Sequence, residues 1–256
     1  MSEVLLESPH PHVAVLKINR PDKLNSLNMA VREDIAAHVT ALDRDETVRV
    51  IIITGNEKAF AAGADIEELR ARAVLDAQFP ASRAAWGALE NCRKPLIAAV
   101  AGFALGGGCE LALHCDIILA AENAKLALRE VTIGIMPGAG GTQRFLRAAG
   151  SYKAARYLMT GDMMSAQVAS EIGLVSEIVP TDQLMERALA LAVQIAGLPQ
   201  LAVHSIKEAI QLGADAPLQT ALALERKSFQ LLFASDDREE GMGAFLEKRP
   251  PDFKGR

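Results

Sequence analysis

Short apolar runs rich in β-branched residues recur through the first 180 positions of the chain. They are VAVLKI (13–18), VRVIIIT (48–54), PLIAAVAG (95–102), DIILAA (116–121) and GLVSEIV (173–179). Runs of this length, with no alternation of apolar and polar residues, are typical of strands that are buried on both faces of a sheet. We therefore predict five buried strands.

The segments between these runs carry apolar residues at helical spacing. After Asn28, a residue type that caps helices, the apolar positions fall on one helix face: Val31, Ile35, Val39 and Leu42. Ser165 predicts the start of a second, short helix that ends near Gly173. Strands that alternate with helices in this way indicate an α/β core.

After Pro180 only helical spacing remains. Three sets of apolar residues follow it, namely Leu184, Ala188, Leu191 and Ile195, then Val203, Ile206 and Ile210, then Leu218, Leu222, Phe229 and Leu232. We therefore expect only helices from residue 182 to about 247, and two regions, a core over 1–180 and a helical region over 181–256. The apolar faces of these helices cover the core or pack on another subunit.

Composition narrows the classes of partner. The chain has 256 residues, a net charge of -5 and a pI near 5.6, which disfavours nucleic acid because phosphate binding needs a basic surface. The most apolar region, 95–121, is interrupted by glycines and charged residues, so no membrane span is expected. No signal peptide is recognisable at the start, and an odd number of cysteines (Cys92, Cys109, Cys115) favours a reducing compartment. We expect a cytoplasmic protein.

The segment GFALGGGCEL (102–111) places three consecutive glycines in front of a glutamate. It matches neither the phosphate-binding pattern G-x-x-x-x-G-K-[ST] nor the dinucleotide fingerprint G-x-G-x-x-G. One interpretation is close packing of a helix on a strand, where a Cβ has no room. The other is a site where a substrate oxygen approaches the free N–H groups at the start of a helix. There a developing negative charge is stabilised, and Glu110 lies in the first helical turn beside it.

Two further segments have the same character. KAFAAGADIEEL (58–69) also brings small residues and a glycine to the start of a helix, so that two segments together can supply two N–H donors to one oxygen. LREVTIGIMPGAGGTQR (128–144) carries Glu130 at the end of an apolar stretch, before a loop with four glycines. Taken alone, Glu130 fits a solvated loop residue and the glycines fit ordinary loop geometry.

Together, these segments resemble the crotonase superfamily, the enoyl-CoA hydratases and isomerases. The matching stretches follow one another in family order: NRPDKLNSLN (19–28), AFAAGADIEEL (59–69), KPLIAAVAGFALGGGCELALHCDI (94–117), EVTIGIMPGAGGTQR (130–144) and GMGAFLEKRPPDFKGR (241–256). The resemblance implies an α/β fold, a crotonase-like spiral of ββα repeats followed by a helical C-terminal region. The tail and the whole-chain pattern look most like the hydratases of phenylacetate breakdown.

The resemblance also implies a reaction and the residues for it. The backbone N–H groups of Ala64 and Gly107 would hold the thioester carbonyl of an acyl-CoA, which becomes enolate-like during the reaction. The hydratases add two glutamates, and both positions are filled here, by Glu110 and Glu130. We expect the helix dipole to favour Glu110 as a carboxylate that activates water, and an apolar setting to raise the pKa of Glu130, which delivers the α-proton. The resemblance places the N–H of Gly138 on the water.

Contacts to coenzyme A are implied at seven positions, which are Lys23, Ser26, Ala62, Asp65, Ile66, Phe245 and Lys248. The last two would reach the coenzyme A of a neighbouring subunit. Glu67 departs from the family, which often has a lysine there, so that contact is absent or replaced. No cofactor is expected because coenzyme A is part of the substrate, and the spacing in CELALHC (109–115) fits no common zinc site.

The expected activity is that of an enoyl-CoA hydratase, which adds water across the α,β double bond of a trans-2-enoyl-CoA and gives a 3-hydroxyacyl-CoA. A Δ3-Δ2 enoyl-CoA isomerase is the alternative enzyme, although the isomerases generally lack the glutamate at the position of Glu110. A non-catalytic binding protein of the same fold is the alternative of another class. The family and the apolar helix faces at 200–212 and 217–233 predict a homotrimer or a dimer of trimers.

Overall fold

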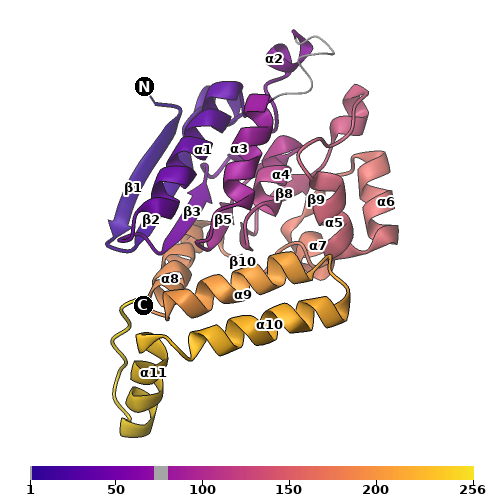
Figure 1. Cartoon of the computed structure of the whole chain (residues 1–256). Helices are drawn as coiled ribbons and strands as arrows, with labels where there is room; N and C mark the ends of the chain where they lie inside the picture. The colour runs from indigo at the N-terminus through magenta and orange to yellow at the C-terminus, as the bar shows by residue number, and fades with distance from the viewer. Residues whose placement is uncertain (1, 72–79) are drawn as a thin grey trace.

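The structure is a computed structural model that describes residues 2–71 and 80–256, with the side chains of 80–82 excepted. From β3 to β8 the chain alternates between two sheets, because each strand of the larger sheet is followed by a short strand of the smaller one (Figure 1). This alternation produces a spiral rather than a flat, doubly wound sheet. The expected α/β spiral is therefore confirmed.

The larger sheet has six strands in the order β1-β2-β3-β5-β7-β10. They are β1 (Val4–His10), β2 (Val13–Ile18), β3 (Val50–Thr54), β5 (Leu96–Val100), β7 (Ile117–Ala121) and β10 (Glu177–Val179). Every neighbouring pair is parallel except β1 and β2. The five predicted runs correspond to β2, β3, β5, β7 and β10. The run at 173–179 pairs only from Glu177 onward, since Leu174 and Val175 are buried in the preceding turn.

The smaller sheet has four strands in the order β4-β6-β8-β9. They are β4 (Ala59–Ala61), β6 (Phe103–Leu105), β8 (Lys125–Ala127) and β9 (Met164–Ser165). Sequence analysis did not predict them, because two or three residues are too few to show a strand period. Two of these strands lead toward the candidate N–H donors: β4 is followed by Ala64, two residues before α2, and β6 is followed by Gly107, the first residue of α4.

Both faces of the larger sheet are buried because successive residues of a strand point to opposite faces. In β3, Ile51 and Ile53 belong to the apolar cluster under α1 (Met29–Arg44) and α3 (Pro80–Glu90). Val50 and Ile52 belong to a second cluster, under α8 (Leu184–Ala196). The run of consecutive apolar residues in the sequence thus reflects a strand with two buried faces.

Two helix starts agree with the predicted caps. The Asn28 side chain accepts a hydrogen bond of 2.8 Å from the backbone N–H of Val31, where α1 begins. The Ser165 hydroxyl accepts one of 3.3 Å from the N–H of Val168 in α7 (Ala166–Glu171). Each cap contributes about 1 kcal/mol to stability. The remaining helices of the first region are α2 (Ile66–Arg70), α4 (Gly107–Leu113), α5 (Gly141–Ala149) and α6 (Ser151–Thr160).

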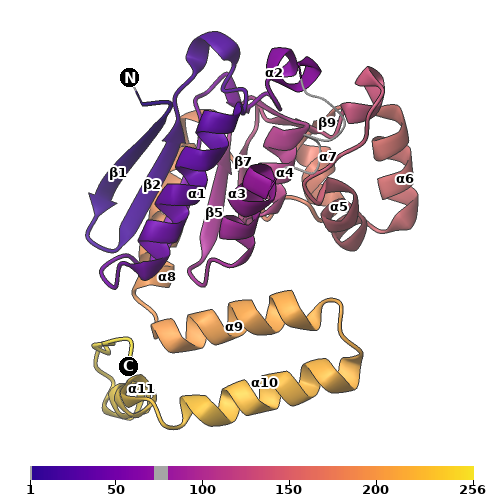
Figure 2. The same ribbon diagram turned by 45° about the horizontal axis from the view of Figure 1, so that its top comes forward.

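The described chain after β10 forms helices, as expected. Beyond α8 come α9 (Gln200–Gly213), α10 (Leu218–Leu232) and α11 (Asp236–Glu247). Figure 2 shows α9 and α10 as an antiparallel pair below the sheets, with α11 at its end. No single helix of the described residues is long and apolar enough to cross a membrane, and only the bent pair 181–196 with 200–213 passes by length and composition. The division at residue 180 stays a prediction.

Candidate active site

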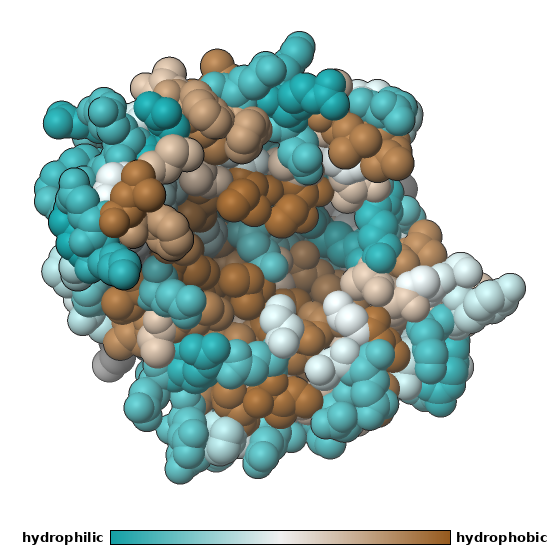
Figure 3. Space-filling model, turned by 90° about the horizontal axis from the view of Figure 1, so that it is seen from below, coloured by the Kyte–Doolittle hydropathy of each residue, from teal (hydrophilic) through white to brown (hydrophobic). Residues whose placement is uncertain are grey.

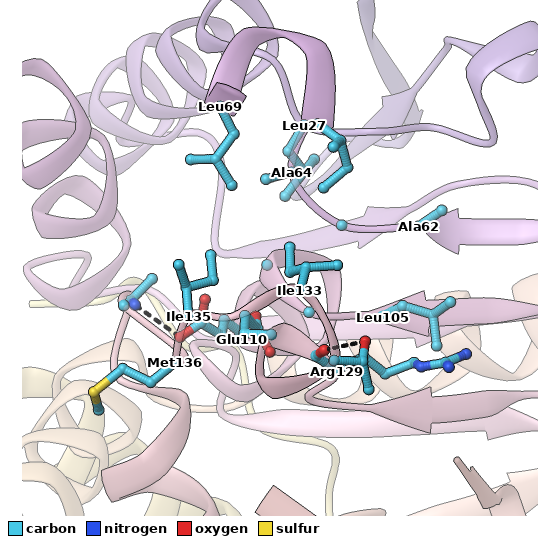
Figure 4. Close-up of a pocket in the computed structure, with 18 of the residues that line it drawn as sticks. Leu27, Ala62, Ala64, Leu69, Leu105, Glu110, Arg129, Ile133, Ile135 and Met136 are labelled. Carbon is cyan, nitrogen blue, oxygen red and sulfur yellow. Dashed lines mark hydrogen bonds between the residues drawn. The ribbon is translucent and has the colours of Figure 1, made fainter. Parts of the chain in front are cut away.

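A cavity of about 300 Å³ lies between α2, α3, the start of α4 and the segment 129–139. Figure 4 shows Leu27, Ala64 and Leu69 on one side of it and Ile133 and Ile135 on the other. Its lining is mostly apolar, with a few polar groups, which is typical of a pocket for a small molecule. The described residues that line it are Leu27, Arg32, Ala62, Gly63, Ala64, Ile66, Leu69, Trp86, Leu105, Gly106, Gly107, Glu110, Arg129, Glu130, Thr132, Ile133, Ile135, Met136, Gly138 and Ala139.

Two backbone N–H groups share one wall of this cavity. Gly106 has φ +50° and turns the chain from β6 into α4, so that the helix begins with Gly107. Within the described residues, neither Gly107 nor Ala64 donates its N–H to a protein acceptor. An ideal Cβ on Gly107 would lie 3.7 Å from the nitrogen of Ala64, and one on Gly63 would lie 4.0 Å from the nitrogen of Gly107. The two donors are therefore near neighbours.

The two glycines at the start of α4, Gly107 and Gly108, are explained by different features of the structure. A Cβ on Gly108 would lie 2.0 Å from the carbonyl oxygen of Ala61 in β4, a distance that no side chain tolerates. A Cβ on Gly107 would meet only ordinary contacts but would project toward the N–H of Ala64. The interpretation of close packing is thus confirmed at Gly108. At Gly107 there is room for a small side chain, and its role as a donor to a substrate oxygen stays a prediction.

Glu110 is buried with 4% of its surface exposed. Its Oε1 accepts hydrogen bonds from the N–H groups of Ala139, at 2.7 Å, and Gly141, at 2.9 Å. Burial raises the pKa of Glu110, while the two N–H donors oppose this rise. The expectation of a carboxylate favoured by the helix dipole is therefore corrected, because the cost of burial exceeds what the N–H groups and the short helix α4 return.

Glu130 approaches the cavity from the short 3₁₀ helix η3 (Glu130–Ile133). Its Oε2 is buried and has no hydrogen-bond partner in the part of the chain that the structure describes, and an ideal Cβ on Gly106 would lie 3.0 Å from its Oε1. Burial, with a smaller contribution from the charge of Glu110, raises the pKa of Glu130 to about 7. The expected direction of this shift is found, so that Glu130 holds a proton far more readily than a solvated glutamate does.

The other predicted residues near the cavity differ in position. Gly138, Ala62 and Ile66 line it. Lys23 is exposed and pairs with Glu67 at 3.7 Å, so the residue that departs from the family pattern meets a lysine of its own chain.

Ser26 and Asp65 do not point freely toward a ligand, because both contact Arg20. The Ser26 carbonyl and hydroxyl accept bonds of 2.7 and 3.0 Å from Nη1 of Arg20, and Asp65 accepts one of 3.2 Å from Nη2. Arg20 thus ties the loop before Leu27 to the residue that follows Ala64. Sequence reasoning missed this role, although Arg20 lies inside the stretch NRPDKLNSLN that carries the resemblance.

Phe245 and Lys248 lie at the opposite end of the molecule, on and just after α11 (Figure 1). Neither residue lines the cavity of its own chain. Phe245 is 83% exposed, and Lys248 ends the helix in a left-handed conformation with φ +56°. Their predicted contact with coenzyme A therefore requires a second subunit.

Two polar residues at or behind the cavity, Arg129 and His114, were not predicted as site residues, whereas Trp86 was expected to be a core or pocket-lining residue. Trp86 and Arg129 line the cavity, and His114 stacks on Trp86 with ring centroids 5.1 Å apart. Nothing in the spacing CELALHC distinguishes His114 from a surface residue. Among the described residues, no group of three or more His, Cys, Asp or Glu side chains is arranged to hold a metal ion.

Comparison with known proteins adds a family to this geometry. The family model "Enoyl-CoA hydratase/isomerase" matches residues 10–256. A "Probable enoyl-CoA hydratase" of Rhizobium meliloti is 45% identical over 254 residues, 99% of each chain. The 2,3-dehydroadipyl-CoA hydratase of Escherichia coli is 44% identical over 256 residues, 100% of each. A crystal structure of an enoyl-CoA hydratase from Bacillus anthracis, 40% identical, has a TM-score of 0.95 and covers 99% of this chain and 100% of that one.

Proposed function

The chain belongs to the enoyl-CoA hydratase/isomerase family, and we propose that Glu110 and Glu130 perform its chemistry. The reaction is the hydration of an enoyl-CoA: water adds across the α,β double bond and a 3-hydroxyacyl-CoA forms. The observation that carries the proposal is the meeting of the buried Glu110 and the half-buried Glu130 with two backbone N–H groups that have no acceptor among the described residues, all at one mostly apolar cavity.

The first step is polarisation of the substrate. The thioester oxygen accepts hydrogen bonds from the N–H groups of Ala64 and Gly107, which draws electron density from the β-carbon. These donors are part of the folded backbone, so they need no rearrangement when the oxygen becomes negative. Such a donor typically contributes about 10²–10³-fold in rate.

The second step is the addition itself. Water is a weak nucleophile, and Glu110 accepts its proton as the oxygen bonds to the β-carbon. The electron pair of the double bond moves toward the thioester, and the α-carbon takes a proton from Glu130. Burial suits Glu130 to this role because it raises the pKa to about 7, so that a large fraction of this acid is still protonated near neutral pH. The Gly138 N–H, which lines the cavity, orients the water.

No observation favours the two alternatives. An isomerase needs only one acid–base group at the pocket, and both glutamates are present here. A binding protein without catalysis would have no need of a carboxyl group held buried by two N–H donors.

For the acyl group, we propose an enoyl-CoA of phenylacetate breakdown. The support is the 44% identity with the Escherichia coli protein named 2,3-dehydroadipyl-CoA hydratase and the resemblance of the C-terminal tail. The test is a panel of enoyl-CoAs, short and long, with and without a terminal carboxylate. The highest kcat/KM is expected for a substrate with a terminal carboxylate. A preference of more than about tenfold for uncharged chains would overturn this choice while leaving hydration intact.

We also propose a homotrimer or a dimer of trimers in the cytoplasm, with no cofactor beyond the coenzyme A of the substrate. Support comes from the exposed apolar residues of the last helices, among them Ile210, Leu218 and Leu231, with 67%, 70% and 75% of their surface exposed. Hydrophobic residues also gather around a hollow on the underside of the molecule (Figure 3). Exposed apolar area of this kind usually marks an interface.

A further inference from the structure

His114 lies one helical turn after Glu110, at the end of α4, and its N–H bonds to the Glu110 carbonyl at 3.0 Å. Residues four positions apart project from the same face of a helix. The side chain of His114 is 1% exposed. It is therefore a buried polar group directly behind a candidate catalytic residue, and the mechanism described above does not use it.

The imidazole of His114 forms a hydrogen bond with Ala139, the residue whose N–H binds the Glu110 carboxylate. Its Nε2 lies 2.9 Å from the carbonyl oxygen of Ala139. A carbonyl only accepts, so Nε2 carries the hydrogen and donates it. The N–H of the same residue, Ala139, donates to Oε1 of Glu110 at 2.7 Å. Two side chains one turn apart on α4, Glu110 and His114, thus bind the N–H and the carbonyl of Ala139.

The surroundings keep His114 neutral and fixed in this tautomer. Its ring is stacked on Trp86 at an interplanar angle of 18°. Glu90 of α3 faces Nδ1 at 3.9 Å and is itself paired with Arg144 of α5 at 3.1 Å. Burial, aided by the charge of Arg144, lowers the pKa of His114 to about 4. At neutral pH the ring therefore carries one N–H hydrogen, on Nε2, and donates it to the carbonyl oxygen of Ala139.

We propose that His114 is a positioning residue for the hydration reaction. By fixing the carbonyl of Ala139, it holds the N–H groups at 139–141 against Glu110 and so fixes the direction from which this carboxylate meets water. The inference rests on the proposed role of Glu110. Without the donor at His114, the carbonyl of the half-buried Ala139 loses its partner, and the segment relaxes away from Glu110.

Three variants test this proposal. His114→Leu removes the donor, whereas His114→Gln places an amide N–H where Nε2 was, and His114→Asn has an amide that is one methylene too short to reach Ala139. Cys115→Ala, a cavity change at the neighbouring position of the chain, is the matched control. The Glu110 carboxylate acts mainly in the transition state, so its displacement should lower kcat. With crotonyl-CoA, kcat should fall by about 10–100-fold in His114→Leu and His114→Asn, with KM changed less than about threefold. The kcat of His114→Gln and of Cys115→Ala should stay within about threefold of wild type.

The pH profile separates positioning from damage to the fold. The N–H groups of Ala139 and Gly141 lower the pKa of Glu110. When they move away from Glu110, its pKa rises. The acidic limb of kcat/KM should therefore move to higher pH by about half a unit or more, in His114→Leu and His114→Asn only. Normal kcat in both His114→Leu and His114→Asn, or an unchanged acidic limb of kcat/KM in these variants, would overturn the proposal. So would a folded His114→Gln with activity as low as theirs. If His114→Leu does not fold, the comparison of His114→Gln with His114→Asn tests the proposal. If wild type itself does not hydrate crotonyl-CoA, the proposed function fails instead.

Discussion

At the scale of single residues, the two carboxyl groups of the cavity differ in what surrounds them. Glu110 has two N–H donors on one oxygen, whereas the Oε2 of Glu130 has none. This difference supports the proposed division of tasks, in which Glu110 accepts a proton and Glu130 donates one. The family resemblance predicted both glutamates. Arg20 and His114 were missed because they contact groups far along the chain, the Asp65 carboxylate and the Ala139 carbonyl, which residue spacing does not reveal.

The raised pKa of Glu130 predicts how the stability of the fold depends on pH. The pKa is about 7 in the fold, above its ordinary value of 4.5, so the unfolded chain releases this proton at lower pH. The contribution to stability is therefore full below about pH 4.5 and is lost as pH rises to about 7. A shift of this size equals about 3 kcal/mol, and solvent in the open cavity reduces the expected effect to about 1–2 kcal/mol.

Glu130→Gln should therefore raise the melting temperature at about pH 8 and leave it nearly unchanged at about pH 4.5. Thermal unfolding at both pH values measures this, with Glu122→Gln, an exposed glutamate, as the control. An equal effect of Glu130→Gln at both pH values would show that Glu130 titrates like a surface residue.

At the scale of elements, the long strands were predictable from the sequence, while the short ones of the smaller sheet were not. Yet the short strands position the site, because β4 and β6 place their neighbours, Ala64 and Gly107, on one wall of the cavity. The predicted helix start at the glycine segment was correct in place. Strand β6, which lies between β5 and α4, was missed because it forms through pairing with β4 and β8. Such non-local pairing leaves no signal in the local sequence pattern.

The two adjacent glycines of α4 offer a matched test. Gly107→Ala should fold with nearly the melting temperature of wild type, because its Cβ meets nothing closer than 3.7 Å, but turnover should fall by at least about 10²-fold as the methyl group crowds the donors. Gly108→Ala should instead destabilise the fold by several kcal/mol, on the order of 3, because its Cβ meets the Ala61 carbonyl. Melting curves and crotonyl-CoA kinetics measure both. Equal behaviour of the two variants would contradict the assigned reasons.

At the scale of the whole molecule, α9 and α10 hold apolar side chains away from the core of their own chain. An ion pair of 2.7 Å between the buried Lys207 and Asp116 fixes α9 to the sheet region, whereas Ile206 and Ile210 on α9 are 60% and 67% exposed. Helical spacing predicted the helices correctly, but it did not say which partner their apolar faces have, because a subunit interface and a core have the same pattern.

This arrangement predicts an oligomer whose subunits share a site. Sedimentation should give a mass of at least three chains. Lys248→Ala should raise KM for the acyl-CoA with little change in kcat, and the effect should shrink at high salt, because an exposed lysine contributes by screened charge. Lys153→Ala, an exposed lysine on α6, is the control. A stable and fully active single chain of 27.3 kDa would refute both parts.

The central claim is that Glu110 and Glu130 together add water to an enoyl-CoA, and one measurement addresses it most directly. Crotonyl-CoA is incubated in D₂O with wild type, Glu110→Gln and Glu130→Gln, and the 3-hydroxyacyl-CoA formed is followed by mass spectrometry. Wild type should introduce one deuterium at the α-carbon, and each variant should form this product about 10²–10⁴-fold more slowly while still binding acyl-CoA. A wild type that makes no labelled hydroxyacyl-CoA, or a variant with nearly normal kcat, would contradict the claim.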